Sequence, residues 1–152
     1  MVSTGGESPA AKYVQDRVEQ CIRRLQESNA FGVEQTIRGA LADVWRECSR
    51  GDWDGYGAMP VSEASFVLAR DFLRSLPLGT PTPSIGAEPD GEITLEWGRE
   101  PRRRLSVSVS PGGDLHFAAV IGAFTRSGTV PFFGDVPPAV LRLIALVEAR
   151  YE

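Results

Sequence analysis

Carboxylates with the spacing of a calcium-binding loop lie between residues 52 and 63. Asp52, Asp54 and Glu63 occupy the first, third and twelfth positions of a twelve-residue loop, and a glycine occupies the sixth. Calcium prefers six to eight oxygen ligands, and the final glutamate of such a loop binds through both of its oxygens. The pattern therefore indicates a calcium site formed by these three acids.

A structural corner is the alternative interpretation of the same segment. The fifth loop position is Tyr56, whose neutral phenol is a poor ligand, Pro60 stiffens the ninth, and a second loop is missing. In a corner, the rings of Trp53 and Tyr56 fill the space between helices and sheet, while an aspartate accepts hydrogen bonds from backbone N–H groups. The corner motif consists of Trp53, Asp54, Gly55, Tyr56 and Gly57.

His116 is the only histidine of the chain, so any histidine-based catalytic pair would have to include it. Its place in a strand pattern favours a sheet residue over a catalytic base. Glu92 and Glu96 project from the polar side of a predicted strand, where solvation is the usual role of carboxylates. A small enzyme or ligand-binding protein with a cleft at Trp53 and Tyr56 is a further alternative. The sequence contains no cofactor-binding motif.

Two segments favour contact with another protein. Arg102, Arg103 and Arg104 form a basic tip between predicted strands, which would bind an acidic partner or oppose edge-to-edge aggregation. Phe132 and Phe133 are adjacent in a predicted loop and cannot easily both point inward. An exposed ring would mark an interface, and the alternative is a loop that folds back over the core. The first hypothesis is therefore a non-catalytic interaction or regulatory module that binds another protein or itself.

Two stretches together resemble a known family. Residues 53–58 with Pro60 form a WDGYGA-x-P motif, and residues 90–97 form a DGEITLEW motif. Both are similar to motifs of a family of small uncharacterised bacterial proteins, and the resemblance extends over residues 52–109. It implies a bacterial cytoplasmic protein of an accessory locus, either a mobile-element or a toxin–antitoxin-like locus. Family members often carry asparagine where this chain has Asp52, which favours the structural corner over the calcium site.

Composition and charge exclude several classes of protein. The 152 residues are 42% hydrophobic and 24% charged, which is ordinary globular usage. The net charge of -4 provides no basic field, so nucleic acid is not an expected partner. Cys21 and Cys48 lack metal-ligand spacing and are predicted to be buried free thiols. No segment is long and apolar enough for an export signal or a membrane span, which predicts a cytoplasmic protein.

These residues must be positioned by an α+β fold. Residues 1–7 are predicted to be a disordered tail and 8–152 a single domain. Apolar periodicity predicts helices over 8–28 and 33–49, a helix capped by Ser62 that ends at Pro77, and a final helix that opens near Pro138. Strands are predicted over 83–88, 93–97, 105–109 and 115–124, with a loop over 125–134.

The order of these elements predicts the architecture. The first two helices should pack antiparallel across their short loop. Consecutive strands joined by turns indicate an antiparallel meander of three or four strands, followed by the C-terminal helix. Because helices and strands are segregated along the chain, the sequence predicts two layers.

Overall fold

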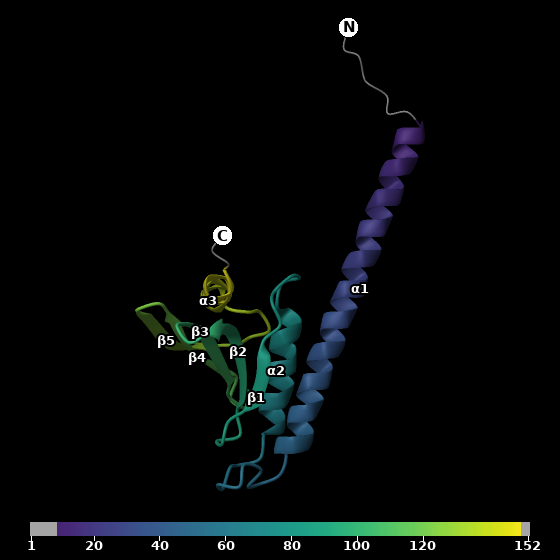
Figure 1. Ribbon diagram of the computed structural model, residues 1–152. Coiled ribbons are helices and arrows are strands. Elements are labelled where there is room, and N and C mark those ends of the chain that lie inside the picture. Colours follow the sequence, from purple (N-terminus) through teal and green to yellow (C-terminus); the bar gives the residue numbers. More distant parts are fainter. Residues whose placement is uncertain (1–8, 150–152) are drawn as a thin grey trace. The chain divides into compact units, whose positions relative to one another are not determined.

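The computed structural model describes residues 9–149, and the predicted tail over 1–7 lies outside them. The chain divides into two compact units, Met1–Gln35 and Thr36–Glu152. The helices are α1 (Pro9–Cys48), α2 (Glu63–Ser75) and α3 (Pro138–Glu148). The strands are β1 (Ser84–Ala87), β2 (Ile93–Glu100), β3 (Arg103–Val109), β4 (Asp114–Ile121) and β5 (Phe124–Pro131) (Figure 1).

One continuous helix, α1, replaces the two N-terminal helices predicted for residues 8–28 and 33–49. The predicted antiparallel pair is therefore wrong. The expected break rests on Asn29 and Gly32, but one glycine inside a helix costs only about 1 kcal/mol relative to alanine. Helix-forming arginine, leucine, glutamine and glutamate residues flank both positions and offset that cost.

Five antiparallel strands form one meander in the order β1-β2-β3-β4-β5. The predicted α+β class with an antiparallel sheet is confirmed, whereas the predicted count of three to four strands is wrong. The additional strand is β5, which covers most of the predicted loop over 125–134. The chain turns into it at Gly122, whose φ of 65° suits the first central residue of a two-residue hairpin.

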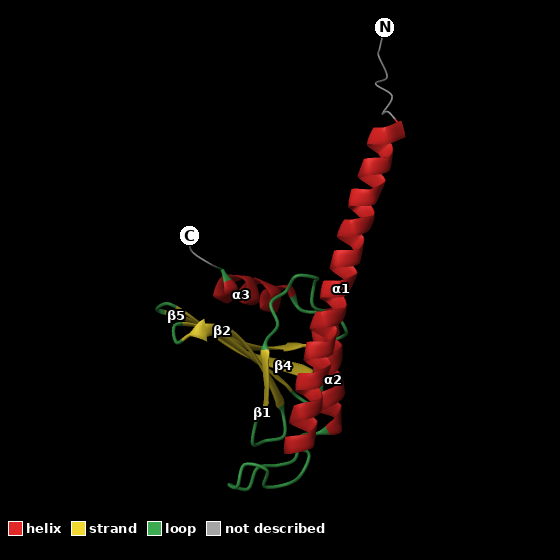
Figure 2. Cartoon of the chain, turned by 45° about the vertical axis from the view of Figure 1, so that its right-hand side comes forward, coloured by secondary structure: helices red, strands yellow, loops and turns green. Residues whose placement is uncertain are grey.

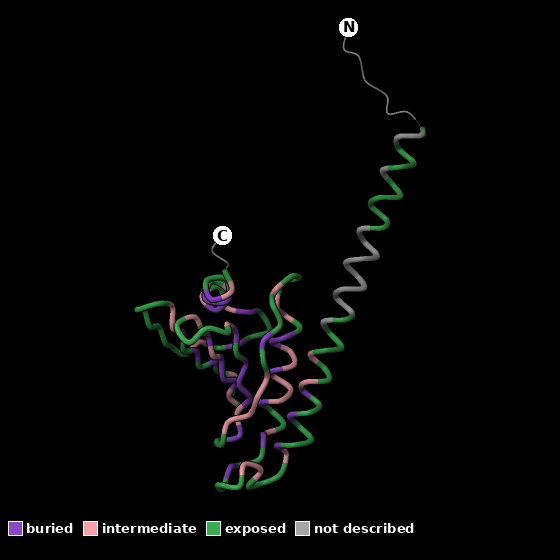
Figure 3. Tube along the Cα trace, viewed as in Figure 1, coloured by how far each residue is buried: buried purple, intermediate pink, exposed green. Residues whose placement is uncertain are grey.

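The apolar face of the sheet packs against α2 and α3. Buried apolar residues of neighbouring strands lie opposite one another, as Leu95, Val107 and Phe117 do in β2, β3 and β4. Helix α3 contacts these three strands, and α2 contacts β2 and β3 (Figure 2). Buried positions concentrate between the sheet and these helices in Figure 3. The inward faces that alternation predicts for β2 and β3 are confirmed.

A third layer makes the two-layer prediction too simple. Within the unit Thr36–Glu152, the C-terminal turns of α1 pack on α2, with the ring centroids of Trp45 and Phe66 5.2 Å apart. Leu41 and Val44 of the same turns are buried in the core. The sheet is thus covered by α2 and α3, and α2 is covered in turn by the end of α1.

The helix boundaries follow from local chemistry. The Ser65 N–H donates to Ser62 Oγ over 2.9 Å, which confirms the predicted N-cap of α2. Helix α3 begins at Pro138, where the missing N–H of proline leaves no helical hydrogen bond unmade. Both cysteines are free, but Cys21 is exposed, so only Cys48 fits the predicted buried thiol. Among the described residues, no helix is long and apolar enough to cross a membrane.

Candidate functional site

The segment from Asp52 to Pro60 folds as a corner whose acids bind the chain's own backbone. Asp54 Oδ1 accepts hydrogen bonds from the N–H groups of Tyr56, over 2.8 Å, and Ala58, over 3.0 Å. Asp52 Oδ1 accepts from the Gly57 N–H over 2.6 Å, and Asp52 itself has a φ of 59°. These bonds are those that the structural-corner interpretation predicts.

The two aromatic residues of the corner behave differently. Trp53 packs against the core while its indole N–H donates to the Met59 carbonyl over 2.8 Å. The side chain of Tyr56 is 93% exposed, so the prediction that its ring fills the interior is wrong. Gly55 and Gly57 turn the backbone outward there, with φ of 77° and 84°. A ring so exposed cannot be the wall of an enclosed cleft.

The three acids proposed as calcium ligands are not brought together. Asp52, Asp54 and Glu63 do not form a group with ligand atoms within 4.8 Å of one another, as far as residues 9–149 are described. Glu63 is the first residue of α2, where a carboxylate is favourable near the positive end of the helix dipole. The calcium interpretation stays a prediction, and the corner bonds already occupy one oxygen of each aspartate.

Asp54→Ala should lower the free energy of unfolding by about 1–2 kcal/mol, because two backbone N–H groups lose their acceptor. Urea unfolding followed by circular dichroism measures the loss. Glu63→Ala is the matched control and should cost about 0.5 kcal/mol through the helix dipole alone. Addition of calcium should leave the melting temperature unchanged. A melting temperature that rises with calcium and falls with chelator would assign the acids to an ion instead.

The outer face of the sheet carries a row of polar side chains. Thr94, Ser108, His116 and Thr129 lie opposite one another in register on β2, β3, β4 and β5. His116 Nδ1 lies 2.9 Å from the hydroxyl of Thr129, and both residues are exposed. The structure therefore places His116 on an open sheet surface, in agreement with the prediction of a sheet residue.

An acidic turn between β1 and β2 borders this row. Glu88, Asp90 and Glu92 each offer a carboxylate oxygen within 4.8 Å of the others. Glu88 Oε1 accepts hydrogen bonds from the hydroxyls of Thr94 and Ser108, each over 2.6 Å. Sequence reasoning missed Glu88, although its place at the end of a predicted edge strand beside a turn was visible. These bonds satisfy the two buried hydroxyls of the outer face.

The charges of this turn act on Glu92. Burial raises the pKa of the Glu92 carboxyl, and the neighbouring Asp90 and Glu88 carboxylates raise it further, while His116 opposes them. A folded-state pKa above the unfolded value means that the ionised carboxylate is less favourable in the folded protein. Glu92 therefore costs stability above its folded-state pKa, and this cost disappears below its unfolded-state pKa.

Glu92→Gln should raise the free energy of unfolding by about 0.5 kcal/mol at pH 7, because the neutral amide removes the cost of burying a charge and the repulsion from Asp90 and Glu88. The gain should vanish as the pH falls below about 4, where the glutamate is protonated in both states. Urea unfolding at the two pH values measures the difference. Glu96→Gln, which changes an exposed glutamate within β2, is the control and should change stability little at either pH. An equal gain at both pH values would contradict the electrostatic explanation.

The predicted arginine tip is partly structural. Arg103 donates from Nη2 to the Leu146 carbonyl of α3 over 2.7 Å. Gly98, at a bulge in β2, donates its N–H to Glu148 Oε1 over 2.9 Å. The hairpin of β2 and β3 thus binds the last turn of α3 at two points. Arg102 and Arg104 are exposed, and their contact with a partner stays a prediction.

Phe132 and Phe133, which follow β5, differ in burial. The Phe132 ring is 7% exposed and lies against Phe72 with centroids 5.6 Å apart. The Phe133 ring is 89% exposed. The prediction of Phe132 as an interaction residue is therefore wrong, because this ring belongs to the core. Phe133 is the one that a partner can reach.

The outer edge of β5 is the longest open surface of backbone in the sheet. Residues 124–129 are all exposed, and the Phe124 side chain is 66% exposed. Among the described residues, β5 pairs only with β4, so its other side has no strand neighbour. β1 is the opposite edge of the sheet and has only four residues. Sequence reasoning missed β5 as a strand and therefore missed this edge.

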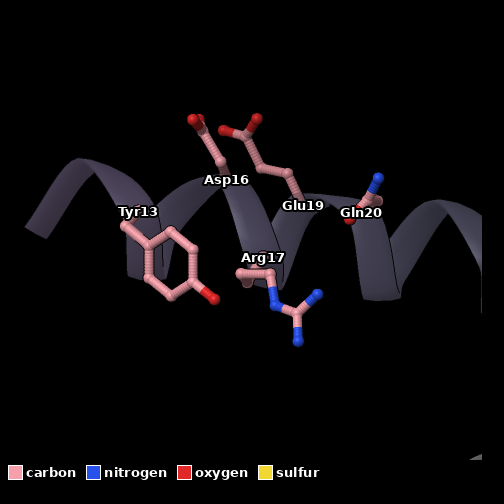
Figure 4. A pocket seen from close by; sticks show the side chains of 5 residues that line it. All are labelled: Tyr13, Asp16, Arg17, Glu19 and Gln20. Atoms are coloured by element: carbon pink, nitrogen blue, oxygen red, sulfur yellow. The ribbon is translucent and has the colours of Figure 1, made fainter. Parts of the chain in front are cut away.

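A hollow on α1 lies among exposed side chains of a single helix. Figure 4 shows the residues that line it, which are Tyr13, Asp16, Arg17, Glu19 and Gln20. Arg17 Cζ lies 5.9 Å from the centre of the Tyr13 ring, within range of a cation–π contact. All five side chains are exposed, so the hollow does not enclose a ligand.

Comparisons of the chain with protein-family models, with curated proteins and with solved structures find no match. The resemblance to a bacterial family stays a prediction that rests on the two sequence motifs. Function is therefore inferred from the geometry of the chain itself.

Proposed function

We propose that this chain is a non-catalytic protein-interaction module that binds its partner along the open edge of β5 and at Phe133. The observation that supports this most is the edge of the eight-residue strand β5, which has no strand neighbour within residues 9–149 and is exposed over residues 124–129. An extended segment of a partner adds to such an edge through backbone hydrogen bonds, which supply affinity, while side-chain pockets supply specificity.

Two exposed phenylalanines flank this edge. Phe124 begins β5, and Phe133 lies two residues beyond its end at Pro131. Large exposed rings at both ends of an open strand are unusual on a monomer surface and supply apolar contact area to a partner. The sequence resemblance supports a bacterial accessory locus, either mobile-element or toxin–antitoxin-like, as the setting for such a module.

The exposed ring provides the direct test. Phe133→Ser should leave the urea unfolding midpoint nearly unchanged and should abolish co-purification of the partner from the cells that encode the chain. Phe132→Ser is the matched control because the neighbouring ring is buried, and it should cost about 3–5 kcal/mol of stability. If both Phe133→Ser and Ser127→Pro, a change within β5, retain every bound partner, the proposal is refuted.

A further inference from the structure

We propose that the partner at β5 is a second copy of this chain, which pairs its own β5 antiparallel to the first with Ser127 opposite Ser127. This inference rests on the proposed function and gives the occupant of the same edge. It follows from three features of β5: the direction of its backbone groups, the register they permit, and the absence of protection along the strand.

The backbone of β5 presents alternate residues to the open edge. In a two-residue hairpin, the residues that flank the turn form a hydrogen-bonded pair, and hydrogen-bonded pairs then recur at every second residue. The flanking pair here is Ile121 and Phe124. The Phe132 N–H donates to the Gly113 carbonyl over 2.9 Å, which extends the same even-numbered parity. The N–H and C=O groups of the odd-numbered Thr125, Ser127 and Thr129 therefore point away from β4.

Only one symmetric register uses all three of these residues well. When the two-fold axis lies at Ser127, each Thr125 lies opposite Thr129 of the other copy. Three residue pairs then exchange hydrogen bonds. If the axis lay one residue earlier, Arg126 would lie opposite Arg126 of the other copy, and directly opposed like charges are destabilising. If the axis lay one residue later, Thr125 would lie opposite Pro131 of the other copy, which has no N–H to donate.

The side chains fit this register on both faces of the extended sheet. Arg126 lies opposite Gly128 of the second copy, a residue that adds no bulk. Packing within the monomer also favours glycine at position 128, because an added Cβ would lie 2.8 Å from Cζ of Phe117. Phe124 lies opposite Val130, which forms an apolar pair, and the threonines on the outer face form favourable cross-strand pairs.

The two edges of the sheet differ in their protection against pairing. β1 has four residues and follows Pro81 and Pro83, as expected of an edge that avoids other strands. β5 has eight residues, and Arg126 is its only charged side chain. An unprotected edge of this length is either an aggregation hazard or an interface. A closed two-fold pair uses this edge completely and leaves no further edge of β5 for growth.

Mass in solution is the first test, by light scattering across a concentration series of the full chain. The wild type should be a dimer at high concentration. Ser127→Lys places two ammonium groups opposite each other and should raise the dissociation constant by about tenfold or more. Ala118→Lys, on the same face one strand inward and exposed, is the matched control and should leave the dimer intact. Circular dichroism verifies that both variants are folded.

A cysteine pair tests the register. In a Cys21→Ser background, which removes the exposed native thiol, Ser127→Cys should form a disulfide-linked dimer under mild oxidation. Hydrogen-bonded antiparallel residues have Cα atoms about 5.5 Å apart, within the range for a disulfide. Thr125→Cys is the control, because it would lie about 14 Å from its own copy, too far to link.

The outcomes separate this inference from the proposed function. A wild-type dimer that Ser127→Lys dissociates and Ser127→Cys links supports pairing through β5. A dimer unaffected by Ser127→Lys, or linked equally by Thr125→Cys, overturns it. A wild type that is monomeric at every concentration also overturns it, and the proposed function then still holds if Phe133→Ser abolishes capture of another protein.

Discussion

Phe72→Ala should lower the free energy of unfolding by about 4 kcal/mol, one of the largest effects expected for this chain. The Phe72 side chain has no exposed surface. Its ring meets Trp97 of β2 edge-on at 6.4 Å and Phe132 at 5.6 Å. Alanine would remove both aromatic contacts and leave a cavity among α2, the sheet and the segment after β5, which those neighbours cannot fill without moving.

Urea unfolding monitored by circular dichroism measures this loss. Because a domain of this size has about 5–15 kcal/mol of stability, the variant should remain folded at low temperature but melt markedly earlier. Phe133→Ala is the matched control, since it deletes a phenylalanine ring that is 89% exposed, and it should change stability by about 0.5 kcal/mol or less. A loss below about 1 kcal/mol for Phe72→Ala would mean that its site collapses to fill the space.

Sequence patterns predicted the parts of the fold whose side chains alternate between core and solvent. The strand pattern at Leu95 and Trp97, and again at Leu105 and Val107, reports burial on one face directly. The cap at Ser62 was equally legible, because a serine before an apolar helical stripe has a specific hydrogen-bonding role. Where local chemistry and burial coincide, the prediction and the structure agree.

Elements without such a signal were predicted wrongly or missed. β5 has exposed polar residues on one face, and on the other face Arg126 and Gly128 separate Phe124 from Val130, so neither face shows an unbroken apolar alternation. It becomes a strand because its backbone pairs with β4, a tertiary effect that periodicity does not report. Helix α1 shows the converse error, since Asn29 and Gly32 resemble a break but cost too little to interrupt the helix.

Surface residues were likewise predicted where local sequence decides their role, and missed where their role depends on residues distant in the chain. The sequence indicated that Phe132 and Phe133 would not both be buried, but the choice between them depends on the ring of Phe72, which is distant in the chain. Likewise, the role of Asp54 as a backbone acceptor was predictable from local spacing. The hydrogen bond that the Ser108 hydroxyl donates to Glu88, twenty residues away, depends on the sheet register and was not predictable from local spacing.

The bulge at Gly98 is the feature on which the other large effect depends. Pairing is Trp97 with Leu105 and then Glu100 with Arg103, so β2 carries one extra residue at this point. Gly98 has a φ of 88°, a conformation that glycine adopts readily and alanine does not. A glycine inside a strand pattern was the available signal for this bulge.

Gly98→Ala should therefore lower the free energy of unfolding by about 2–4 kcal/mol. An added Cβ would overlap the Arg103 carbonyl oxygen, so the hairpin has to move as well as adopt a strained φ. Movement there also releases the bonds to Glu148 and Leu146, so amides of α3 should exchange hydrogen faster than those of α2. Gly86→Ala is the control, because no atom lies within 4 Å of its added Cβ, and it should be nearly neutral. Equal losses for the two variants would show that glycine content matters here, and that the bulge geometry does not.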